Sequence, residues 1–179
     1  MKPREPDHPP MKEAFVYSAS WWSSSWDYRR ATWDGKTTVY ADFRRVTNPQ
    51  HNVALRGHIG WNGDILVELL RVDKFRDMLA RIVSLAWSHR IVHIVMYCRA
   101  GKHRSVAAAC LMQNLLLMIN PNMSVVTEHL EKNTWGRSTC EGQCDECMLK
   151  KNADEIQDWT RDVLNMLPYE QELPEVWLG

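Results

Sequence analysis

IVHIVMYCRAGKHRS, residues 91–105, is the stretch of sequence that decides the fold. Its first eight residues form a nearly continuous apolar run, which is typical of a strand buried on both faces of a parallel sheet. Residues 105–119, at the end of the basic loop, predict a helix, and Asn120 and Pro121 end it. A buried strand that leads through a short loop into a helix indicates an α/β fold.

The surrounding sequence continues this alternation. Residues 14–19 (AFVYSA), 38–42 (TVYAD) and 123–127 (MSVVT) are short runs of β-forming residues, and each predicts a strand. In residues 72–88 the apolar positions recur at spacings of three and four, which predicts an amphipathic helix. We therefore expect an α/β, Rossmann-like layered fold with a mostly parallel sheet.

The two ends of the chain differ from this core. Residues 1–12 are polar and Pro-rich, without the apolar stretch of a secretory signal, and predict a disordered leader. Residues 133–179 contain a Cys-rich loop, an acidic amphipathic helix near 152–166 and a Glu-rich tail. We expect this C-terminal extension to be added to the α/β core, which then spans residues 13–132, rather than to be part of it.

The charge balance of zero hides an asymmetry. Lys and Arg total 22, as do Asp and Glu, but residues 1–110 hold 17 basic and 10 acidic side chains, whereas the remaining residues hold 5 and 12. This distribution favours a focused anion site over a broad nucleic-acid surface.

No apolar run reaches the roughly 18 residues that a membrane span needs. With five cysteines and no export signal, we expect a soluble protein of the reducing cytoplasm.

Tryptophan is abundant, with nine residues in the chain and three of them in SASWWSSSW, residues 18–26. Because each indole buries a large area, we expect most of these side chains to anchor the core. The alternative is an aromatic platform on which nucleic-acid bases stack.

The loop YCRAGKHRS, residues 97–105, has the chemistry of a phosphate site. A helix that starts after a strand offers free backbone N–H groups and the positive end of its dipole to an anion. Gly101 allows a tight turn, and the guanidinium of Arg104 can bind two phosphate oxygens at once. The candidate phosphate-binding residues of the loop are Arg99, Gly101, Lys102, His103, Arg104 and Ser105.

The spacing from Cys98 to Arg104 is that of the CX5R loop of cysteine-dependent phosphatases, in which a thiolate attacks phosphorus. Catalysis there also needs a general acid, and the sequence contains no obvious acid loop. Tyr97 stands where such loops usually carry a His. Phosphate binding is therefore the leading interpretation, with a phosphatase that uses Cys98 as one alternative and a basic turn with a buried thiol as another.

Taken together, these residues resemble the C-terminal domain of the RNase adapter protein RapZ, whose loop has the form CTGG[QK]HRSV. The matching loop positions are Cys98, Gly101, Lys102, His103, Arg104, Ser105 and Val106. The family's D-x-R-x-x-x-N-P stretch is matched by DFRRVTNP, through Asp42, Arg44, Asn48 and Pro49. Leu55, Arg56 and Gly60 continue the similarity, which covers roughly residues 14–132.

The resemblance implies a standalone domain without the family's N-terminal nucleotide-binding half, because no Gly-rich Walker-type sequence occurs. It also implies that the domain senses an amino-sugar phosphate and that the domain contacts RNA. Gly101, His103 and Arg104 would hold the phosphate, with Asp42 and Arg44 facing it from a neighbouring strand end. The alternative for the last two is a structural salt bridge that supports the loop.

Two departures from the family loop bear on the ligand. Arg99 replaces a Thr and Ala100 replaces a Gly, which adds bulk and charge and favours a more highly charged ligand, such as a nucleotide or a phosphorylated RNA end. We expect a sensor or adapter for a phosphate ester, with RNA or a protein as a further partner. A structural subunit with a vestigial site is the remaining alternative.

Cys140, Cys144 and Cys147 form a C-x3-C-x2-C cluster. Three close thiols favour zinc with a fourth ligand from elsewhere, and His129 is the nearest candidate in the sequence. Free or redox-labile thiols and an iron–sulfur cluster are the alternatives. His58, beside Gly57, is a further candidate for a place near the phosphate pocket.

Overall fold

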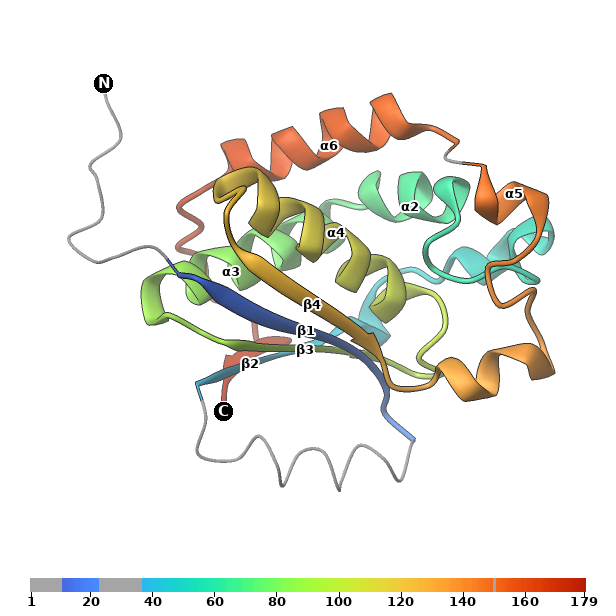
Figure 1. Cartoon of the computed structure of the whole chain (residues 1–179), viewed down its shortest axis with the longest axis horizontal. Helices are drawn as coiled ribbons and strands as arrows, with labels where there is room; N and C mark the ends of the chain where they lie inside the picture. Colours follow the sequence, from blue (N-terminus) through green and yellow to red (C-terminus); the bar gives the residue numbers. More distant parts are fainter. Residues whose placement is uncertain (1–10, 23–36, 150) are drawn as a thin grey trace.

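The computed structural model describes residues 11–22, 37–149 and 151–179, which form a five-stranded sheet in the order β4-β1-β3-β2-β5 (Figure 1). Four strands are parallel: β1 (Glu13–Ser20), β2 (Thr38–Asp42), β3 (His93–Cys98) and β4 (Ser124–His129). The fifth, β5 (Val176–Leu178), pairs with β2 in the antiparallel direction. The α/β layered fold with a mostly parallel sheet is therefore confirmed.

Helices cover one face of this sheet (Figure 1). The long helices α3 (Asp73–His89) and α4 (Arg104–Ile119) pack directly on the strands, and both were expected from the sequence. A shorter helix, α2 (Gly63–Leu70), was not expected, and its eight residues make only about two turns. The outer helix is α6 (Ala153–Asn165), the short helix α5 (Asp145–Met148) precedes it, and the 3-10 turns are η1 (Phe43–Arg45), η2 (Pro49–His51), η3 (Val53–Leu55) and η4 (Lys132–Arg137).

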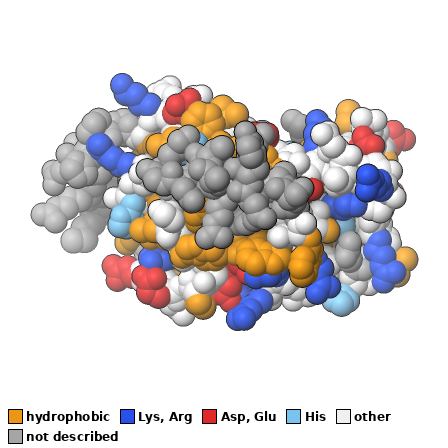
Figure 2. All heavy atoms as spheres, turned by 90° about the horizontal axis from the view of Figure 1, so that it is seen from below, with side chains coloured by type: hydrophobic (Ala, Val, Ile, Leu, Met, Phe, Trp, Pro, Cys, Tyr) orange, Lys and Arg blue, Asp and Glu red, His pale blue; other side chains and the backbone are white. Residues whose placement is uncertain are grey.

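The central strand β3 is buried on both faces, as its sequence predicts. Ile94 and Met96 belong to the main core beneath the helices, whereas Val95 and Tyr97 face the other side of the sheet. There they pack with Tyr17, Ala19 and Tyr40, and Figure 2 shows hydrophobic side chains gathered on this side of the molecule.

The C-terminal extension packs against the α/β core and adds an edge strand to its sheet. Val163 of α6 and Val176 of β5 are buried in the main core. β5 also extends the sheet, with Trp177 opposite Tyr40 of β2. The physical reason is that an amphipathic helix and an apolar strand both need a partner surface, and the α2–α3–α4 layer and the open edge of β2 provide it.

At the other end, Met11 packs against the core, and residues 1–10 of the expected leader lie outside the described residues. Within the described ranges, no helix is long and apolar enough to cross a membrane.

Candidate functional site

The carboxyl ends of the parallel strands place the basic loop beside the end of β2. In the sheet register, Ser20 of β1 lies opposite Cys98 of β3, and Asp42 of β2 lies opposite Tyr97. The loop after β3 and the η1 turn after β2 therefore meet at one edge. Between them is a cavity of about 750 Å³, lined by Trp22, Asp42, Arg44, Arg45, Val46, Thr47, Asn48, His51, Cys98, Arg99, Ala100, His103 and Arg104.

Arg104, the first residue of α4, is buried at the wall of this cavity with only 7% of its surface exposed. Its Nη1 donates to the carbonyl oxygens of Arg44 at 2.7 Å and Val46 at 2.8 Å, which fixes the guanidinium in place. Burial lowers the pKa of Arg104, with Cys98 and Asp42 acting in the opposite direction, but an arginine remains cationic. Among the described residues, no carboxylate forms an ion pair with it.

Asp42 and Arg44 form a two-pronged ion pair with each other. Arg44 Nη2 donates to Asp42 Oδ2 at 2.7 Å and its Nε donates to Oδ1 at 2.9 Å, so this hydrogen bonding raises the pKa of Arg44. The backbone N–H of Arg44 also donates to Asp42 Oδ1, and its guanidinium lies 3.9 Å from the centre of the Trp21 ring. The geometry is that of the structural salt bridge, although both side chains line the cavity.

The other loop residues divide between the cavity and its support. Arg99, His103 and the thiol-bearing Cys98 line the cavity. Lys102 and Ser105 do not, because the Lys102 ammonium contacts Ser138 Oγ and the Ser105 hydroxyl lies 3.2 Å from Cys98 Sγ. The His103 ring is held by a hydrogen bond from its Nε2 to the carbonyl oxygen of His58 at 2.7 Å, and burial lowers the pKa of His103.

Sequence reasoning missed several lining residues on the η1 side. Arg45, Val46 and Thr47 lie inside the DFRRVTNP stretch and His51 follows it, and all four line the cavity. The motif could have predicted these residues. In this fold class ligands bind at the carboxyl ends of the strands, so the turn that follows such a strand end is expected to line the pocket.

Gly101 supports the loop through its backbone conformation. It has a φ of +65°, and a Cβ there would lie 2.6 Å from Glu131 Cγ and 3.0 Å from the backbone nitrogen of Ser20. We expect Gly101→Ala to lower the free energy of unfolding by about 2–4 kcal/mol, from backbone strain together with steric overlap. Urea unfolding of the variant checks this value.

Gly57→Ala is the matched control, because no heavy atom lies within 4 Å of a Cβ at that position. We expect it to change the free energy of unfolding by less than about 0.5 kcal/mol. Equal effects of the two substitutions would contradict the role given to Gly101.

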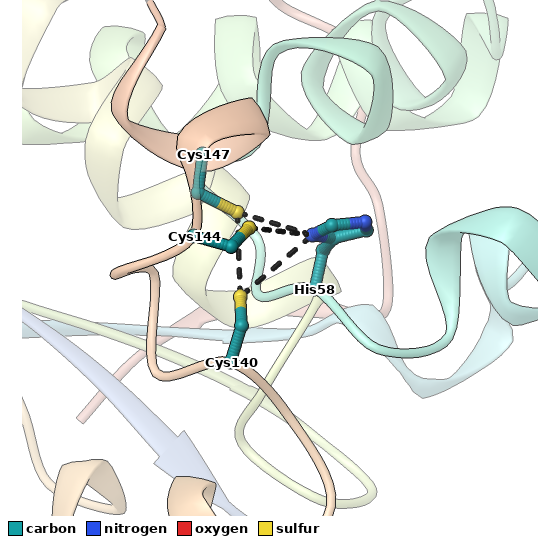
Figure 3. A group of neighbouring side chains, drawn as sticks. All are labelled: His58, Cys140, Cys144 and Cys147. Carbon is teal, nitrogen blue, oxygen red and sulfur yellow. Dashed lines mark hydrogen bonds between the residues drawn. The ribbon is translucent and has the colours of Figure 1, made fainter.

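A second cluster brings together three cysteines and a histidine from segments far apart in the sequence. His58, Cys140, Cys144 and Cys147 point their ligand atoms toward one another, all within 4.8 Å (Figure 3). The Nδ1 atom of His58 lies 3.3 Å from the sulfurs of Cys144 and Cys147 and 3.7 Å from that of Cys140. This group can hold a metal ion.

The surroundings of the cluster are arranged for such an ion. His58 Nε2, the ring nitrogen that faces away from the sulfurs, lies 3.1 Å from a carboxylate oxygen of Glu146. Asn62 Nδ2 donates to Cys147 Sγ and the Gly142 N–H donates to Cys140 Sγ, both at 3.4 Å. A carboxylate behind a histidine and N–H groups directed at sulfur are the outer contacts that orient metal ligands.

His129 is not the fourth member of this cluster, which corrects the expectation from the sequence. It lies at the end of β4, where its Nδ1 is 2.7 Å from Ser18 Oγ and its ring packs against Trp61 and Trp135. Burial lowers the pKa of His129 to about 4, so it is a neutral core histidine. His129 was suggested as the fourth ligand because it is close to the cysteines in the sequence. The fold instead places His58, from a segment far from the cysteines in the sequence, beside them.

The fold and this site define a class of protein, a small α/β domain with an arginine-lined cavity at the carboxyl edge of a parallel sheet. The chain belongs to the RapZ C-terminal domain family, whose sequence model matches residues 23–133. The resemblance seen in the sequence is thereby confirmed, and family membership supports a role as a RapZ-like adapter or binding domain. A comparison with curated proteins finds no match.

Proposed function

We propose that the domain binds a phosphate ester in the arginine-lined cavity. The observation that carries the proposal is the burial of the Arg104 cation at the cavity wall, without an ion pair to a carboxylate among the described residues. A buried charge is costly unless it is compensated, and a phosphate oxygen is the acceptor that the planar guanidinium fits best.

The class of ligand follows from the other cations of the cavity. Arg45 and Arg99 are both exposed, and Arg44, although paired with Asp42, contributes a third guanidinium. Several cations around one cavity favour a ligand with more than one negative charge, such as a phosphosugar, a nucleotide or a phosphorylated RNA end. In this proposal the domain is a sensor or adapter whose further partner is RNA or a protein.

A thermal-shift panel tests the proposal with inorganic phosphate, glucosamine-6-phosphate, adenosine monophosphate and a 5′-phosphorylated oligoribonucleotide. A ligand at 100 times its Kd stabilises the folded state by about 2.7 kcal/mol. For a chain of this length that corresponds to a rise in Tm of about 5–10 °C. Glucosamine and adenosine, which lack the phosphate, are the matched controls. The absence of a shift with all the phosphate compounds would overturn the proposal.

Cys98→Ser distinguishes binding from catalysis. The thiol is buried beside Ser105, and Asp42, the one carboxylate among the described residues that line the cavity, is held by Arg44. We expect the wild-type protein not to hydrolyse p-nitrophenyl phosphate, and the Ser variant to bind a phosphate ester with a Kd within about threefold of the wild type, because no covalent step depends on the sulfur. Hydrolysis by the wild type that disappears in the Ser variant would instead establish a phosphatase.

We also propose that the ion held by the His58 cluster is zinc. Zn–S bonds of about 2.3 Å and a Zn–N bond of about 2.0 Å in a tetrahedron place two sulfurs about 3.8 Å apart, and a sulfur and a nitrogen about 3.5 Å apart. The cluster has a Cys140–Cys147 sulfur separation of 3.6 Å and sulfur–nitrogen separations of 3.3–3.7 Å. Metal analysis of protein purified without chelator tests this, with one zinc per chain expected.

A further inference from the structure

The His58 cluster and the cavity are connected through His58, which belongs to the cluster and whose backbone contacts a residue of the cavity wall. The ring of His58 contributes Nδ1 to the cluster, while its backbone carbonyl accepts the hydrogen bond from His103 Nε2 at 2.7 Å. His103 in turn lines the cavity and is the residue directly before the first turn of α4. The position of the His58 backbone therefore sets the position of a cavity side chain.

The neighbours of His58 tie the same two sites together. The Gly57 carbonyl accepts a hydrogen bond from the N–H of Cys140 at 2.8 Å, which joins this segment to the cysteine loop. The Gly60 N–H donates to the carbonyl of Lys102 at 2.8 Å, and a Cβ on Gly60 would lie 2.1 Å from the carbonyl oxygen of His103. Residues 57–60 are thus held between the cysteine loop and the basic loop.

A second link comes from the segment that precedes the cysteines. Trp135, fully buried in η4, donates its indole Nε1–H to the carbonyl of Gly101 at 3.1 Å. Ser138 contacts the ammonium of Lys102. Three consecutive residues of the basic loop, Gly101 to His103, are therefore each held by a segment that the metal ligands anchor.

We propose that metal binding by His58 and the three cysteines holds the basic loop in its ligand-binding conformation, so that affinity for phosphate depends on metal occupancy. The inference rests on the proposed phosphate-binding function. Without an ion, three thiols and an imidazole have no common partner, and residues 57–60 and the cysteine loop keep only weaker links, such as the Gly57–Cys140 hydrogen bond and the His58–Glu146 contact. His58 is then a positioning residue that acts on the cavity through His103.

The test measures phosphate affinity against free zinc concentration. Isothermal titration with glucosamine-6-phosphate and with adenosine monophosphate is carried out on the full chain in zinc buffers, and far-UV circular dichroism is recorded at each concentration. We expect at least about tenfold weaker binding at low zinc, within the usual range of coupling between two sites, with full recovery when zinc is restored. Because coupling is reciprocal, the phosphate compound should raise zinc affinity by the same factor.

Glu146→Gln is the diagnostic variant. Its side chain is 56% exposed and touches His58 only at Nε2, so the change should weaken zinc binding by about 10- to 100-fold without disturbing the fold. We expect the zinc concentration at half-maximal phosphate binding to rise by that factor, and the affinity at saturating zinc to equal that of the wild type. Glu155→Gln, at a half-exposed carboxylate of α6 that pairs with Arg71 and not with the cluster, is the matched control and should leave both values unchanged.

The outcomes separate the two proposals. Zinc-loaded wild-type protein that binds neither probe would overturn the phosphate-binding function. Equal affinity with and without zinc, in protein that binds, would overturn only the coupling. Loss of affinity that occurs solely where the circular dichroism signal is also lost would overturn it as well, because unfolding rather than loop position would then be the cause.

Discussion

Replacing Arg104 by Ala is expected to weaken phosphate-ester binding by about 100-fold, the largest effect of any single substitution in the cavity. Charge-assisted hydrogen bonds contribute about 1.5–3 kcal/mol each, and the upper value corresponds to roughly 150-fold in Kd. Arg104 is also the cation that burial and two backbone carbonyls hold most firmly. Isothermal titration of the wild type and the variant with the most stabilising phosphate compound measures the loss.

Two controls make this measurement specific. Arg104→Lys keeps the charge but lacks the planar fork, and we expect it to recover only part of the affinity. Arg161→Ala removes an exposed guanidinium on α6 and should leave binding unchanged. Urea unfolding accompanies the series, because truncation of Arg104 leaves the carbonyls of Arg44 and Val46 without its hydrogen bonds, at a cost of about 1–3 kcal/mol. Unchanged phosphate affinity in folded Arg104→Ala would contradict the assignment of the cavity.

Removal of the metal is expected to produce the largest change in stability. If zinc is present at 1,000 times its Kd, it stabilises the folded state by about 4.1 kcal/mol. Its removal by a chelator, or the loss of one ligand in Cys144→Ser, should then lower Tm by about 8–16 °C. Differential scanning calorimetry with and without chelator measures the difference, and added zinc should restore the wild type but not the variant.

Cys110→Ala is the matched control for the loss of a thiol. Cys110 lies in α4, away from the cluster, and burial raises the pKa of its thiol to about 12, so that it stays protonated. We expect this variant to respond to chelator as the wild type does. A Tm that is unaffected by chelator in the wild type would contradict a metal with a structural role.

The sequence predicted the centre of the fold well, because that information is local. The apolar run that became β3 and the spacing that became α3 and α4 each depend on neighbouring residues alone. The loop between β3 and α4 was likewise recognisable from its glycine, its cations and its position between a strand and a helix. Of the loop residues singled out from the sequence, Cys98, Arg99, His103 and Arg104 line the cavity, as does Asp42 from the other motif.

Other features depended on contacts between distant segments. Lys102 belongs to the basic loop by sequence, yet its side chain is directed at Ser138 rather than at the cavity. The strand β5 has only three residues, and without the open edge of β2 beside it no local pattern marks it as part of the sheet. Such assignments require knowledge of which surfaces meet.

The His58 cluster shows which part of a site the sequence determines and which part the tertiary structure decides. The sequence by itself determined that three cysteines lie close enough to share an ion, since only six residues lie between the first and the last. Only the tertiary structure decided that His58, not His129, completes the group, because the turn after η3 passes the cysteine loop while β4 carries His129 into the aromatic core. Spacing along a chain limits which residues within one loop can meet, but the choice between two distant histidines depends on how helices and strands pack. That same packing joins the cysteine loop to the basic loop through the backbone of His58.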